Sequence, residues 1–146
     1  MRTIMGLTLA IAIGGLATAE DKPADAAKKL EGTYTVVEFL TNGKPSPKTA
    51  EIKTVEIKDG VISINLDKKS EDANFTLDPS KKPMEIDLKK KNGGTVLGIY
   101  QTKETDKGLE LTIAYIPERS NGEGNRPKDF KGEGKEEAVF RLLRKK

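Results

Sequence analysis

The stretch VEIKDGVISINL, residues 55–66, carries the strongest fold signal in the chain. The dipeptide Asp59-Gly60 lies near its centre, and apolar residues alternate with polar ones on both sides. Asp-Gly between two alternating segments is typical of a tight β-hairpin, because a type I′ turn needs a positive φ at both central residues. Residues 55–66 therefore predict two antiparallel strands that each cover a core with one face.

Segments of the same kind recur along most of the chain, separated by clusters of Gly, Pro, Asn and Asp. Alternating apolar residues favour strands, and the turn residues between them favour hairpins. The pattern predicts eight strands, at residues 33–40, 51–58, 61–66, 74–78, 84–88, 95–101, 109–115 and 137–143. Eight strands in up-and-down order can close on themselves and leave no unpaired edge. We therefore expect an all-β fold, an eight-stranded antiparallel barrel, with a sandwich as the alternative.

Residues 1–19 have the composition of a secretory signal peptide. Arg2 precedes an apolar run at residues 4–16, and Ala17-Thr18-Ala19 fits the small-x-small pattern of a cleavage site. The run is shorter than the roughly 20 residues of a membrane-spanning helix, which makes an uncleaved anchor the weaker alternative. We expect export to the periplasm or the cell exterior, with no membrane span left after cleavage.

The region after this signal peptide, residues 20–31, reads as a linker with one short helix. Pro23 favours the start of a helix over residues 24–30, and Gly32 favours its end. The expected domain organisation is then a signal peptide at 1–19, a linker with a short helix at 20–31, and one β-domain at 32–146.

The amino-acid composition argues against several classes of function. The chain has no His, Cys or Trp, so it lacks the usual general base near neutral pH and the preferred ligands of zinc, copper and iron. Lys and Arg number 26 against 23 Asp and Glu, and the two signs are interspersed rather than gathered on a basic face. We therefore expect no enzyme activity, no cofactor, no metal site and no nucleic-acid partner.

Five segments, in order, resemble the small exported lipocalin-like domains of the planctomycete type: LEGTY (30–34), FTLDPSKKP (75–83), IDL (86–88), LGIY (97–100) and RPKDF (126–130). The resemblance covers residues 30–145. It implies an eight-stranded lipocalin-like barrel and implies no catalytic residues, because none is known for the family.

The resemblance also implies a structural lock at the start of the barrel. Lipocalins open with Gly-x-Trp, and the Trp packs against an Arg of the last strand. Here Gly32 and Tyr34 occupy the Gly and Trp positions, and either Arg141 or Arg144 supplies the guanidinium. An Arg over an aromatic ring contributes about 0.5–2 kcal/mol, and Tyr offers less ring than Trp.

We expect the domain to bind a small, largely apolar molecule in or at the mouth of the barrel, because an eight-stranded barrel is wide enough for one small ligand. The same side chains could instead fill the interior completely. The expected lining residues are Val36, Ile64, Phe75, Ile86, Tyr100, Ile113 and Phe140.

The long, Gly-rich segment 117–135 supports a second hypothesis, a protein-interaction or inhibitor-like module that acts through this loop. Two interpretations of its RPKDF unit remain open. Phe130 could dock the loop across the barrel mouth while Arg126 faces a ligand or partner. Alternatively, Phe130 plugs the end of the core and Arg126 bonds loop carbonyls. The sequence leaves the oligomeric state undetermined.

Overall fold

The computed structural model describes residues 21–117 and 126–146, so the expected signal peptide and residues 118–125 of the long loop lie outside the described part. The elements are helix α1 (Pro23–Leu30), the 3-10 helix η1 (Pro47–Glu51), and strands β1 (Gly32–Thr41), β2 (Lys44–Pro45), β3 (Ile52–Lys58), β4 (Val61–Leu66), β5 (Ser70–Asp78), β6 (Met84–Lys90), β7 (Thr95–Thr105), β8 (Gly108–Tyr115) and β9 (Ala138–Lys145). The helix and the predicted strand regions are all present, together with the additional short strand β2.

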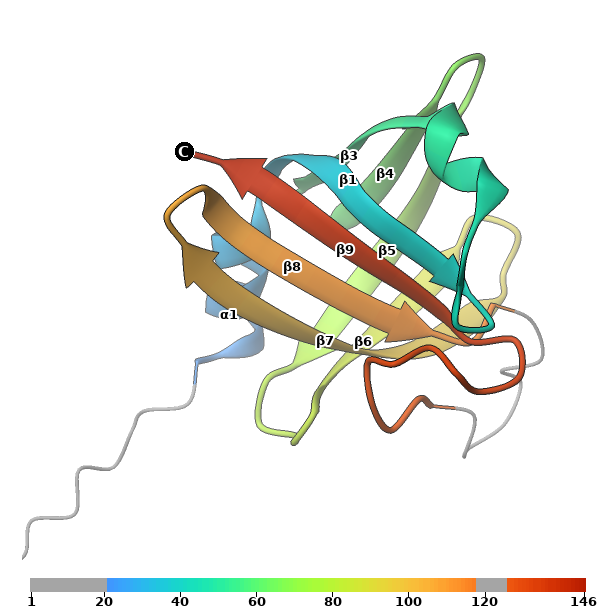
Figure 1. Cartoon of the computed structure of the whole chain (residues 1–146). Helices are drawn as coiled ribbons and strands as arrows, with labels where there is room; N and C mark the ends of the chain where they lie inside the picture. The colour runs from blue at the N-terminus through green and yellow to red at the C-terminus, as the bar shows by residue number, and fades with distance from the viewer. Residues whose placement is uncertain (1–20, 118–125) are drawn as a thin grey trace, which may run out of the picture.

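The sheet closes into a barrel of eight antiparallel strands, β1 and β3 to β9, because β1 pairs with both β3 and β9 (Figure 1). Strand β2 adds only a small hairpin to β1 across Asn42-Gly43. At the β3–β4 turn, Asp59 and Gly60 have φ values of 50° and 76°, as the type I′ hairpin requires. The predicted barrel is therefore confirmed, and the sandwich alternative is wrong.

The alternating apolar residues of the strands point into the interior and form the core. Tyr34, Ile57, Ile86 and Leu111 are among the most deeply buried side chains. In β1 the alternation is interrupted by a bulge between Val36 and Glu38, where the register to β9 shifts. The intervening Val37 is 60% exposed, which makes it the one large exposed apolar side chain of the described residues.

Strand β5 begins at Ser70 rather than at the predicted residue 74. Its first residues, Ser70 to Ala73, are mostly polar, and they join the barrel because their backbone pairs with β4, from Asn65↔Ser70 onward. The predicted boundary follows side-chain hydrophobicity, whereas the ladder depends on backbone groups, which every residue carries.

The two ends of the barrel differ. Helix α1 covers one end, called here the closed end, with Ala26 and Leu30 buried in the core (Figure 1). The other end, called here the open end, carries η1 and the connections β4–β5 and β6–β7, and there β8 ends and β9 begins. Within the described ranges 21–117 and 126–146, none of the helices has the length and apolar character to span a membrane.

Candidate functional site

A cavity of about 630 Å³ opens between the loops of the open end and reaches into the barrel. Its volume is in the range of sites that hold small organic ligands. The wall includes these apolar side chains, which point into the barrel: Val55, Ile62, Ile64, Leu88, Val96, Ile113, Phe140 and Leu142. The rim is polar and comprises Lys48, Ser70, Glu71, Asp72, Lys90, Lys91 and Asn92. The barrel is therefore neither filled throughout nor hollow throughout.

An aromatic stack forms part of the wall next to the mouth. The rings of Phe39 and Phe140 lie 4.1 Å apart between centroids, at 10°, and the Tyr115 ring lies 6.1 Å from that of Phe140. Tyr115 lines the cavity together with Phe140. Burial raises the pKa of the Tyr115 hydroxyl, and the carboxylate of Glu71 raises it further. Tyr115 therefore stays neutral near pH 7 and brings a hydroxyl donor to an otherwise apolar wall.

Three of the seven predicted lining residues, Ile64, Ile113 and Phe140, do line this cavity. The other four belong to the core outside the cavity lining: Phe75, Ile86 and Tyr100 are buried there, and Val36 packs against it. The alternation identifies which side chains face inward but carries no information on their depth, so core and lining residues look alike in sequence.

Sequence reasoning missed several residues of the cavity. Tyr115 and Leu88 share the alternation of Ile113 and Ile86, respectively, and this signal could have identified them as inward-facing. The charged rim residues carried no such signal, because their place depends on the loops that come together at the open end.

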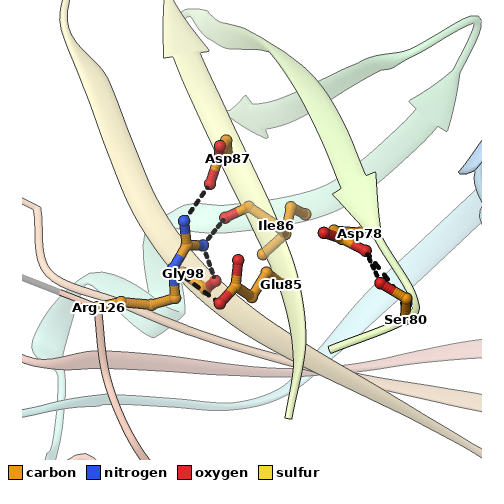
Figure 2. A network of polar contacts seen from close by, with 7 residues as sticks. All are labelled: Asp78, Ser80, Glu85, Ile86, Asp87, Gly98 and Arg126. Carbon is orange, nitrogen blue, oxygen red and sulfur yellow. Dashed lines mark hydrogen bonds and ion pairs between the residues drawn. The ribbon is translucent and has the colours of Figure 1, made fainter. Parts of the chain in front are cut away.

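Arg126 is bound to the barrel wall (Figure 2). One terminal nitrogen, Nη1, donates to the carbonyls of Gly98 (2.6 Å) and Ile86 (3.4 Å), and Nη2 donates to Oδ1 of Asp87 (2.8 Å). Its Nε lies 3.6 Å from Oε1 of Glu85. The interpretation that Arg126 bonds loop carbonyls is wrong, because the carbonyls that it bonds belong to strands β6 and β7. The guanidinium that the other interpretation turns toward a ligand or partner is engaged with these two strands.

Phe130 packs on the outside of the barrel, against a small cluster that contains Ile99, Ala114 and Val139. It therefore neither crosses the mouth nor plugs the end of the interior core, and both expectations for this residue are wrong. The physical reason is that these positions of β7, β8 and β9 are apolar although they face outward, so they need a cover. Together, Arg126 and Phe130 attach the segment 126–137 to the outer wall.

The expected lock lies at the closed end, away from the cavity. The guanidinium carbon of Arg144 is 5.8 Å from the centroid of the Tyr34 ring. Gly32, with a φ of 141°, leaves room for the Arg144 stem, since a Cβ on Gly32 would lie 2.5 Å from its Cδ. Arg141 does not take part: it is exposed and pairs with Glu38 at 3.1 Å.

The described residues contain no group of three or more acidic side chains arranged to hold a metal ion. Comparison of the chain with protein-family models, with curated proteins and with solved structures gives no match. Any inference about function therefore depends on the cavity at the open end of the barrel.

Proposed function

We propose that this protein is a non-enzymatic binding protein that holds a small, largely apolar molecule in the open end of its barrel. One observation carries the proposal, the apolar cavity of about 630 Å³ that opens at one end of a closed barrel. Removing apolar surface from water provides about 25 cal/mol per Å². A preformed cavity retains most of that free energy for binding, since little has to be ordered.

The hypothesis of a protein-interaction module is supported less well. It needs the 117–135 loop to present side chains to a partner, and its two candidate residues were Arg126 and Phe130. Both are engaged with the barrel instead, through the Asp87 ion pair and the Ile99 cluster. Export, which the composition of residues 1–19 predicts, would place the cavity outside the cytoplasm.

A cavity-filling substitution tests the proposal. Ile64 lines the cavity and is only partly buried, so Ile64→Trp places an indole ring inside it. The matched control is Val37→Trp, which adds the same ring to a side chain that is 60% exposed on the outer wall. Binding is measured by the fluorescence of a neutral naphthylamine probe, and native mass spectrometry of the purified protein shows any molecule that co-purifies with it.

We expect wild type and Val37→Trp to take up the probe, and Ile64→Trp to bind it at least tenfold more weakly. Circular dichroism serves to check that both variants remain folded. Uptake that is unchanged in a folded Ile64→Trp variant would show that the probe binds elsewhere. Failure of the wild type to bind the probe, together with a clean apo mass, would remove the basis of the proposal.

A further inference from the structure

The charges at the rim of the cavity are unequally paired. Glu71 forms an ion pair with Lys69, whose Nζ lies 2.7 Å from Oε1 of Glu71. Asp72 forms one with Lys91, whose Nζ lies 2.8 Å from Oδ2 of Asp72. The hydroxyl of Ser70 donates to Asp72 as well, at 3.1 Å. The hydrogen bond from Lys91 lowers the pKa of Asp72 most, and that from Ser70 lowers it further. Asp72 is therefore a charged carboxylate near pH 7, and its charge is already paired with Lys91. Both carboxylates of the rim are thus already neutralised by lysines of the protein.

Two rim lysines remain, Lys48 and Lys90. Both line the cavity and are exposed, and neither has an ion-pair partner within residues 21–117 and 126–146. Lys90 continues the inward alternation of Ile86 and Leu88 at the end of β6. The mouth therefore has an excess of positive charge directly above an apolar wall.

The backbone at both lysines is fixed by local hydrogen bonds. Ser46 accepts from the amide of Lys48 at 3.3 Å, and the amide of Ser46 donates to the carbonyl of Phe39 at 2.8 Å. Lys90 closes the β6–β7 turn, because its amide donates to Gly94 at 2.8 Å and its carbonyl accepts from Gly93 at 3.1 Å. The backbone from which each of these two side chains extends is thus held at a defined position on the rim.

We propose that the ligand is an anionic amphiphile, with an apolar chain in the cavity and one carboxylate head group at the rim beside Lys48 and Lys90. This inference rests on the proposed function and specifies its ligand class. The chain supplies affinity, at about 0.8 kcal/mol per buried CH₂. The head group supplies orientation, because a charge at one end prevents the chain from entering in the opposite direction.

Three probes with the same apolar chain test the head-group charge: decanoate, decanol and decylamine, each competing at low salt and pH 7 for the neutral naphthylamine probe. We expect decanoate to bind about three- to tenfold more tightly than decanol, since exposed ion pairs contribute modestly, and decylamine to bind most weakly. The preference should shrink as salt is added, because exposed charges are screened.

The double variant Lys48→Gln/Lys90→Gln should abolish the preference for decanoate over decanol. The matched control is Lys103→Gln/Lys107→Gln, which removes two exposed lysines from the opposite end of the barrel and should leave the preference intact. Equal binding of decanoate and decanol, or tightest binding of decylamine, would overturn the anionic ligand and leave the cavity proposal standing. If decanoate, decanol and decylamine all fail to bind, both the anionic ligand and the proposed binding function are overturned.

Discussion

Replacing Arg144 by Ala should loosen the closed end of the barrel, because this side chain joins the last strand to helix α1. Its Nη1 donates to the carbonyl of Lys29 at 3.0 Å and also to the carbonyl of Glu31, and its guanidinium lies over the Tyr34 ring. Each hydrogen bond contributes about 0.5–1.5 kcal/mol, and a partly exposed cation–π contact about 0.5–1 kcal/mol. We therefore expect Arg144→Ala to lower the free energy of unfolding by about 2 kcal/mol.

The measurement is urea unfolding followed by far-ultraviolet circular dichroism, which suits a chain without Trp. Arg141→Ala is the matched control, since Arg141 lies on the same strand and makes only an exposed ion pair to Glu38. Arg141→Ala should lower the free energy of unfolding by less than about 0.5 kcal/mol. A double-mutant cycle with Tyr34→Leu should give a coupling energy of about 0.5–1 kcal/mol.

Equal losses for Arg144→Ala and Arg141→Ala would refute the view that Arg144 fastens the helix to the barrel. Tyr34→Phe separates the ring from its hydroxyl, which donates to the carbonyl of Leu30 at 2.7 Å. We expect this variant to lose about 1–2 kcal/mol and to keep the coupling to Arg144. Loss of the coupling in Tyr34→Phe would mean that the hydroxyl, and not the ring, mediates the contact.

Three further substitutions test other parts of the wall. Phe130→Ala should lower the free energy of unfolding by about 2 kcal/mol, because the ring covers Val139 and its neighbours on the outer wall, yet it should leave probe binding unchanged; weakened binding would place the segment at the mouth after all. Gly98→Ala should cost about 1–3 kcal/mol in a urea titration, since its Cβ would lie 2.7 Å from the carbonyl oxygen of Ala114, and a neutral result would contradict this close approach. Burial, assisted by nearby carboxylates, raises the pKa of Tyr100 to about 12, against about 10 in the unfolded chain. The protonated hydroxyl is thus favoured in the folded state, so stability should be level below pH 10 and fall between about pH 10 and 12, less steeply in Tyr100→Phe than in wild type; identical alkaline profiles for the two proteins would speak against this pKa.

Local sequence pattern was sufficient to predict the strands and the barrel. The hairpin at Asp59-Gly60 follows from the φ values that this dipeptide tolerates, and alternation places residues such as Ile113 on the inner face. Both signals act between residues that are close in sequence, so they can be recognised without tertiary information. The bulge at Val37 had no such signal, because only the pairing of β1 with β9 creates it.

The tertiary structure decided which inward residues are core and which line the cavity, as Ile86 and Ile64 illustrate. Depth in a barrel depends on where the two ends lie and on what covers each, and helix α1 covers only one of them. The place of Phe130 also depended on contacts distant in sequence, since its partners come from three strands. Charge pairing at the rim followed the same rule: Lys90 and Lys91 are adjacent in the chain, but only Lys91 meets a carboxylate, that of Asp72 on a neighbouring strand. Periodicity thus determined which face each strand residue takes, whereas free space, covering contacts and charge balance arise only when distant segments meet, and these are the features on which the proposed binding depends.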